Sequence, residues 1–263
     1  FLELIKTALS LDHIGFHQAK YYLLMSDLFI ETRGIDDAIE TIDEAISLDP
    51  SNMGIFGIKI KLLMMDNKSD EAIALVSQLY DKKLIIKKDY SKSVSFLYFV
   101  KADKTKDPVE RMKLINKSFK EIEPIIDLYP EDSGILNNLT VLYGHLGRKE
   151  DAIRTGEKLI SLNPSDGNYF DSYGEILMLF GEYDKAIAKF ERALKLEPKG
   201  WFAFQTYLKM GNCYEKLLQL DKAEENYLKG KMLTEKMHPL KREMYSYKAN
   251  EKLDGLRKLR EEL

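Results

Sequence analysis

The residue types that most often carry catalysis are sparse in this sequence. Four histidines and one cysteine, Cys213, are the whole supply of imidazole and thiol groups in 263 residues. His145 could act as a base, but no serine or cysteine nucleophile is linked to it by a known motif. The segment from Gly147 to Lys158, GRKEDAIRTGEK, misses the spacing of a phosphate-binding loop, and no dinucleotide-binding glycine pattern follows a strand. We therefore expect no enzymatic activity and no cofactor.

The same scarcity argues against metal sites and disulfides. A single cysteine excludes an intramolecular disulfide and any site with several thiolate ligands, and four histidines leave little for zinc. Cys213, between Gly211 and Tyr214, is interpreted as a small buried apolar residue. The ten methionines, including Met64 and Met65, are interpreted as core filling. No metal site is predicted.

Charge and hydropathy exclude further classes of protein. Forty Lys and Arg face 43 Asp and Glu, so the net charge of -3 gives no general attraction to nucleic acid or to anionic membranes. A hydrophobic fraction of 44% is enough for a buried core. No uninterrupted apolar run exceeds five residues, as in Ile176 to Phe180, whereas a membrane span needs about 20. We expect a soluble chain with a cytoplasmic location and no membrane span.

Lysine is concentrated in one segment. Eight lysines lie between Asp81 and Lys106, against three aspartates, and such a cluster could contact phosphate. The aromatic residues in and beside it have the spacing of a buried helix face, and the near-neutral chain lacks a basic stripe. A solvated lysine face is therefore favoured, and a nucleic-acid partner is not expected.

Internal repetition decides the fold class. Comparison of the chain with itself gives a period of 34, most clearly for residues 136–164 against residues 170–198. Small residues recur at this spacing, with three extra residues implied near Trp201: Ala38, Ala72, Ala152, Ala186 and Ala223. One divergent copy with an insertion fills the gap between Ala72 and Ala152, with Ser118 in the place of the alanine.

Each copy has the pattern of two amphipathic helices joined by a short turn. In the clearest copy, spacings of three and four place two sets of residues on single helix faces: Phe170, Tyr173, Gly174 and Leu177, then Ala186, Phe190 and Ala193. Gly181 to Asp184 form the turn between them. This order of aromatic, apolar, glycine and alanine positions, closed by a proline, resembles the tetratricopeptide repeat (TPR) family. The resemblance covers about six copies, five of them recognisable.

The copy at about residues 86–130 departs most from the pattern. Asp107, Pro108 and Glu110 have the residue types of a helix cap, a first-turn proline and a capping-box acid, so a helix is predicted to begin there. Pro124 falls late in this helix. Because proline disrupts a helix interior, we expect a kink or an early end at Glu123.

The expected architecture is all-α, a right-handed α-solenoid of about six helix-turn-helix repeats. Residues 19–236 form the predicted solenoid, and residues 237–263 are predicted as a charged C-terminal capping helix. Residues 1–18 have the apolar spacing of the end of a preceding repeat. Because the first residue is Phe1 rather than Met, we expect the native protein to extend further toward its N-terminus.

The resemblance implies a non-catalytic scaffold that binds a peptide segment of a protein partner in a concave groove lined by the first helices of the repeats. Positions not needed for packing should face this groove: Asp27, Lys61, Asn138, Val141, Asp171, Glu175, Lys209 and Asn212. Asn138 and Asn212 are the preferred contacts, because an amide can pair with both backbone groups of an extended peptide. The alternative is that both are simply solvated.

The remaining charges of the predicted groove allow two interpretations. Asp171 and Glu175, four residues apart, could attract a basic segment, or they could be two ordinary solvated acids. One TPR subset clamps the C-terminal carboxylates of chaperones, but the matching positions here are occupied mostly by uncharged residues: Asn137, Val141, Ser172, Gln205 and Lys209. This clamp is expected to be absent. An alternative function is the sensory or docking region of a larger regulator or enzyme, and the oligomeric state stays open.

Overall fold

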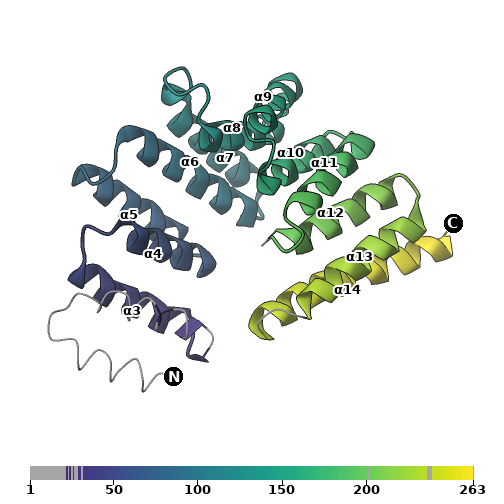
Figure 1. The fold of residues 1–263 in the computed structure, drawn as a ribbon, viewed down its shortest axis with the longest axis horizontal. Coiled ribbons are helices and arrows are strands. Elements are labelled where there is room, and N and C mark those ends of the chain that lie inside the picture. Colours follow the sequence, from purple (N-terminus) through teal and green to yellow (C-terminus); the bar gives the residue numbers. More distant parts are fainter. Residues whose placement is uncertain are drawn as a thin grey trace. The chain divides into compact units, whose positions relative to one another are not determined.

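The computed structural model describes residues 32–200, 202–235 and 239–262, together with residues 22, 24, 26, 29 and 30. All regular elements in these residues are helices, as the sequence predicted (Figure 1). The predicted end of a preceding repeat at residues 1–18, the groove position Asp27 and the residue Trp201 lie outside the described residues. The chain divides into two compact units after Glu121, and each is described by itself.

The first unit contains helices α3 (Ile35–Leu48), α4 (Met53–Met65), α5 (Ser69–Asp81), α6 (Lys87–Lys104) and most of α7 (Pro108–Ile122). Its apolar residues form two successive clusters between neighbouring helices. One cluster joins α3 to α4 through Ala38, Ile42 and Ile55, and the other joins α4, α5 and α6. The packing is therefore local along the chain, as expected of stacked helix pairs.

The second unit contains the 3-10 turn η1 (Glu123–Ile125) and helices α8 (Ser133–His145), α9 (Lys149–Leu162), α10 (Gly167–Leu179), α11 (Tyr183–Leu196), α12 (Ala203–Lys216), α13 (Leu220–Thr234) and α14 (Pro239–Glu262). The pairs α8–α9, α10–α11 and α12–α13 are three repeats, each with a first and a second helix. Phe190, Met210 and Cys213 belong to a cluster that joins consecutive repeats.

The small residues of the 34-residue pattern lie where helices approach closely. All five predicted alanines are fully buried. A Cβ atom added to Gly174 would lie 2.7 Å from the Phe190 ring, and one added to Gly211 would lie 2.2 Å from the Tyr227 ring. The glycine on a first helix therefore makes room for an aromatic ring on the second helix of the same repeat.

Ser118 takes the place of the alanine in the divergent repeat, as the spacing predicted. It is fully buried, and its hydroxyl donates a 2.6 Å hydrogen bond to the carbonyl oxygen of Ser95 on α6. The two serine hydroxyl oxygens are 3.1 Å apart. Helices α6 and α7 are thus joined by polar groups at the position where the other repeats have an alanine.

The ends of α7 confirm the local predictions for the divergent repeat. The helix begins at Pro108, and the Asp107 carboxylate accepts a 2.9 Å hydrogen bond from the backbone N–H of Val109. It ends at Ile122, and Pro124 lies in the 3-10 turn that follows. The chain then continues without regular helix to α8.

Most first helices end in a left-handed turn residue. Gly147 and Gly181 have φ values of 73° and 77°, and Leu218 takes the same conformation at 57°. After Gly181, the N–H of Glu182 donates to the carbonyl of Leu177, and the N–H of Gln219 donates to Tyr214 in the same way after Leu218. These bonds satisfy the last carbonyl groups of each first helix.

Helix α14 covers the apolar side of the last repeat. Ala249, Leu253 and Leu256 are buried against Tyr227 and its neighbours. Arg260 donates to Asp221 and Glu224 at 2.7 Å each. The charged capping helix predicted for the C-terminal residues is thus present, with its apolar face on α13.

Candidate functional site

A charged network joins the first helices of two consecutive repeats. Asp171 and Glu175 lie one helical turn apart on α10, and Thr206 and Lys209 lie one turn apart on α12. The start of α10 sets the positions of the two acids, because the Asp166 side chain caps it by accepting a hydrogen bond from Tyr169 N–H. Four side chains from two helices thereby meet at one place.

The geometry of this network pairs every charge. The two carboxylate oxygens of Asp171 accept from the Thr206 hydroxyl at 2.6 Å and from the Lys209 ammonium at 2.9 Å. Lys209 is also 2.5 Å from a carboxylate oxygen of Glu175. The side chains of Asp171 and Lys209 are 8% and 17% exposed, whereas that of Glu175 is 46% exposed. The network therefore has a buried end and an open end.

Electrostatics keep Lys209 charged in this environment. Burial alone would lower the pKa of its ammonium group, but the negative charges of Asp171 and Glu175 outweigh burial and raise that pKa above its usual value. One cation thus faces two carboxylates, and the surplus negative charge lies on the side where Glu175 reaches solvent.

This network corrects one interpretation of the sequence. Asp171 is not a solvated acid, because its carboxylate is buried and bonded to Thr206 and Lys209. Glu175 is the member of the pair that stays accessible. Thr206 was missed as a functional residue, although its position three residues before Lys209 puts it on the same helix face.

Asn212 takes part in a second arrangement on α12. The Tyr227 hydroxyl lies 2.9 Å from the Asn212 amide oxygen and 2.8 Å from a Glu215 carboxylate oxygen. Burial, with the nearby Glu215 charge, raises the pKa of Tyr227 well above its usual range. Asn212 is therefore engaged with the second helix of its own repeat, which the spacing alone did not indicate.

Asn138 lies half-buried on α8, the first helix of the preceding repeat. Val141 is one turn further along and stands 34 residues before Glu175, so it takes the equivalent position. Asn138 and Val141 lie on the side of α8 away from Leu136, Leu139 and Tyr143, because successive helix residues are rotated by about 100°. Of the five predicted site residues, Asp171, Glu175 and Lys209 share one network.

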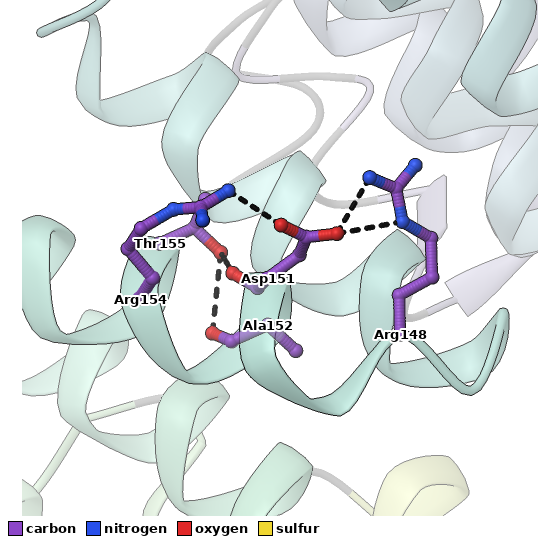
Figure 2. A network of polar contacts seen from close by, with 5 residues as sticks. All are labelled: Arg148, Asp151, Ala152, Arg154 and Thr155. Carbon is purple, nitrogen blue, oxygen red and sulfur yellow. Dashed lines mark hydrogen bonds and ion pairs between the residues drawn. The ribbon is translucent and has the colours of Figure 1, made fainter.

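A second polar network surrounds Asp151 on α9 (Figure 2). Arg148 Nε donates to one carboxylate oxygen at 2.8 Å, and Arg154 pairs with the other. The hydrogen bond from Arg148 lowers the pKa of Asp151 below its usual value. The Arg148 guanidinium also lies 4.3 Å from the centre of the Tyr143 ring. No sequence motif indicated this cluster, which depends on side-chain directions at the start of a helix.

Two pockets lie on the sides of α8 and α12 away from the predicted groove residues. The larger, about 400 Å³, is bounded by Tyr207, Met210 and Tyr214 of α12 together with residues of α11 and α13. The smaller, about 280 Å³, is bounded by Leu136, Leu139 and Tyr143 of α8 with residues of α9 and the segment after η1. Both pockets therefore rest on the packing face of a first helix.

The lysine-rich segment is used in part for packing between helices. Lys101 of α6 donates to the Asp70 carboxylate at 2.6 and 2.7 Å. Lys104 donates to the carbonyl of Met64 and to the side chain of Asn67, both at 2.7 Å. These two lysines tie α6 to the end of α4 and to the start of α5, so they are not simply solvated.

Cys213 is fully buried, and burial raises the pKa of its thiol to about 12. This agrees with its interpretation as a small apolar residue. Within the described residues, no group of three or more His, Cys, Asp and Glu is arranged to hold a metal ion. The same residues include no helix that is both long enough and apolar enough to span a membrane.

Comparison with known proteins identifies the repeat. Residues 19–52 and 168–199 each match a tetratricopeptide repeat model. A TPR protein of Parabacteroides merdae superposes with a TM-score of 0.64 at 12% identity, covering 94% of this chain and 90% of that one. Two segments of the chain are thus tetratricopeptide repeats. A thermophilic TPR protein of Thermus thermophilus gives 0.59 at 14% identity, covering 76% of this chain and 99% of its own.

Two curated proteins match over part of their length. The human protein O-mannosyl-transferase TMTC1 is 20% identical over 213 residues, which is 80% of this chain. Hsp70-Hsp90 organizing protein 3 of Arabidopsis thaliana is 30% identical over 83 residues, or 32% of this chain. The matched segments span only 23% and 15% of the lengths of these relatives. TPR arrays are protein–protein interaction scaffolds, and the present chain has that architecture.

Proposed function

We propose that this TPR chain is a non-catalytic scaffold whose first helices α8, α10 and α12 bind an extended peptide segment of a protein partner. The observation that carries this proposal is the network of Asp171, Glu175 and Lys209. It joins α10 to α12 and leaves the carboxylate of Glu175 at its accessible end. A polar face of this kind suits a peptide, whose unpaired backbone groups need hydrogen-bonding partners.

The charge of the network selects among peptides. Lys209 is already paired with two carboxylates, so it is not available to clamp a carboxylate from a partner. Glu175 is half exposed and belongs to a group with one cation and two acids. We therefore expect a peptide with a lysine or arginine near Glu175, and the absence of a chaperone-type carboxylate clamp remains part of the proposal.

Affinity capture with crosslinking tests the proposal. The doubly substituted chain Asn138→Ala with Glu175→Ala removes two accessible groups from this face and leaves the buried Asp171–Lys209 pair intact. A matched control replaces Glu157 and Lys195, which are exposed on the second helices α9 and α11. We expect the first variant to lose crosslinked partners that the control retains. Equal recovery by both variants would refute binding at this face.

A second candidate function is a docking region within a larger regulator or enzyme. The observation that favours it is that the two curated relatives are several times longer than the matched segment. Sequencing of the complete reading frame distinguishes the two candidates, because an attached catalytic or DNA-binding domain would favour the second.

A further inference from the structure

We propose that the pocket of about 280 Å³ on α8 binds a partner peptide that inserts one large apolar side chain and places a carboxylate beside Arg154 and Lys158. This site is separate from the peptide face proposed above. Asn138 is rotated by about 100° around α8 from Leu139, and none of the residues of that face lines the pocket. A partner could occupy either site without the other.

The interruption of α7 explains why this pocket exists. Pro124 lies in the 3-10 turn that ends the helical backbone, so Ile126, which stands 34 residues before Ile160 in the last turn of α9, is not helical, and Tyr129 and Pro130 follow it. These residues form one wall, and Leu139 and Tyr143 of α8 form the floor. The irregular segment thus stands where a continuing second helix would pack.

The next repeat shows how the equivalent surface is covered elsewhere. Thirty-four residues after Lys158 stands Arg192, whose guanidinium lies 5.8 Å from the centre of the Phe170 ring. Lys189 lies 5.7 Å from the Tyr173 ring in the same repeat. Long cationic side chains thus lie over the rings of that first helix. In the repeat formed by α8 and α9, the residue 34 positions before Lys189 is Thr155. Its side chain is shorter than that of lysine and lines the pocket.

The size and lining of the pocket favour a single side chain as the occupant. Small-molecule and cofactor sites are usually about 300–1,000 Å³, so this pocket lies just below their range. Most of its lining is apolar or aromatic, so removing a leucine or phenylalanine side chain from water there is favourable. Leu128, 69% exposed in the wall segment, extends the apolar surface outside the pocket.

The charges at the rim favour an acidic neighbour for that side chain. Arg154 and Lys158 line the pocket with one acid, Asp127. Asp151 is shared between Arg148 and Arg154 (Figure 2). The charged residues that line the pocket are thus two cations and one acid. The Arg154 side chain is 72% exposed, and one of its terminal nitrogens pairs with Asp151, so its other N–H donors can reach a second carboxylate.

The test is an NMR titration of the full chain with three capped dipeptides. Acetyl-Leu-Glu-amide contains both proposed features, acetyl-Ala-Glu-amide lacks the large apolar group, and acetyl-Leu-Gln-amide lacks the charge. We expect the first to shift the amide signals of residues around Leu139 and Thr155 and to bind more tightly than the other two. Equal affinity for the leucine and alanine peptides, or shifts confined to other surfaces, would overturn the proposal.

Variants separate the two parts of the site. The double variant Arg154→Glu with Lys158→Glu should lower the affinity for acetyl-Leu-Glu-amide by about tenfold, because two attractions to the peptide carboxylate become repulsions. Lys195→Glu on α11 reverses one charge outside the pocket and should leave the affinity unchanged. Thr155→Leu fills the pocket and should abolish binding while the thermal midpoint shows that the chain is folded. If the Thr155→Leu and Lys195→Glu chains bind acetyl-Leu-Glu-amide with the same affinity, the pocket is not the binding site.

Discussion

At the scale of single residues, the Asp171–Lys209 pair is the clearest case of charge held out of solvent. Both side chains are mostly buried, and Thr206 supplies a further hydrogen bond to the carboxylate. Such a pair contributes little net stability compared with apolar residues, but removal of one partner leaves the other charge buried without compensation. The network therefore constrains how α10 meets α12.

We expect Lys209→Met to lower the free energy of unfolding by about 3 kcal/mol, because Asp171 would remain buried without its cation. Urea denaturation followed by circular dichroism measures the change. The exposed Lys195→Met is the control and should change stability by less than about 0.5 kcal/mol. Adding Asp171→Leu to Lys209→Met should recover part of the loss, and strictly additive losses would contradict the coupling.

Because Cys213 is buried, we expect the free energy of unfolding to depend on pH. Burial raises the pKa of its thiol from 9.0 to about 12. The unfolded chain therefore releases this proton at a lower pH than the folded chain, and the stabilising contribution is present below pH 9 and lost as the pH rises toward 12.

Between about pH 8 and about pH 10, the free energy of unfolding should fall by about 1 kcal/mol more in the wild-type chain than in Cys213→Ala. Urea denaturation of both chains at the two pH values measures this difference. The packing defect of the variant is common to both pH values and cancels. Parallel pH profiles would show that the thiol does not carry the effect.

At the scale of elements, the ends of the first helices illustrate how local sequence and backbone conformation agree or conflict. Gly181 has φ of 77°, where glycine has no steric penalty. Leu218 occupies the equivalent turn with φ of 57° and a 64% exposed side chain. A leucine in this conformation costs roughly 1–2 kcal/mol, and little burial compensates it.

Leu218→Gly should therefore raise the free energy of unfolding by up to about 1 kcal/mol, the relief of strain less the greater entropy of unfolded glycine. The thermal midpoint measures it. Gly181→Leu, the reciprocal change at the equivalent turn, should destabilise the chain by a similar amount. A loss of stability in Leu218→Gly would show that the leucine side chain contributes more packing than its exposure indicates.

The elements that local signals govern were predicted from sequence. The start of α7 at Pro108 and its end before Pro124 depend only on neighbouring residue types, and both are confirmed. The burial of Ser118 follows from the repeat period. The pairing of Asp171 with Lys209 was not predicted, because it depends on the directions of side chains on two helices, 38 residues apart in the chain. The pocket beside Tyr129 was missed for a similar reason, since a break in periodicity does not say what fills the gap.

At the scale of the whole molecule, each apolar cluster of the second unit that is described below contains residues of one repeat and of the helix that follows it. Phe190 of α11 packs in one cluster with Met210 and Cys213 of α12, and Tyr227 of α13 packs with Leu253 of α14. Stability in such an array is approximately a sum of repeats and nearest-neighbour interfaces. A perturbation at one end should therefore weaken with distance.

A chain that ends at Glu235 lacks α14 and exposes the apolar side of Tyr227 and Phe204. We expect hydrogen exchange to show lost protection in α12 and α13 and retained protection in α8 and α9. Substituting only Arg260→Ala is the milder control, because it removes the ion pairs to Asp221 and Glu224 and keeps the apolar cover. Uniform loss of protection from α8 to α13 would indicate one cooperative block instead.

The serine contact between α6 and α7 has a mechanical consequence. Ser95 and Ser118 meet through hydroxyl groups, and within the described part of the chain the buried Ser91 hydroxyl has no hydrogen-bonding partner. Hydroxyl groups gain less from leaving water than the apolar side chains that join α3 to α4 and α4 to α5 and α6. Under tension applied at its two ends, the chain should lengthen first by separation of α6 from α7. When a partner is bound to the C-terminal repeats, the contact between α6 and α7 would therefore open under tension before the proposed binding face is disrupted.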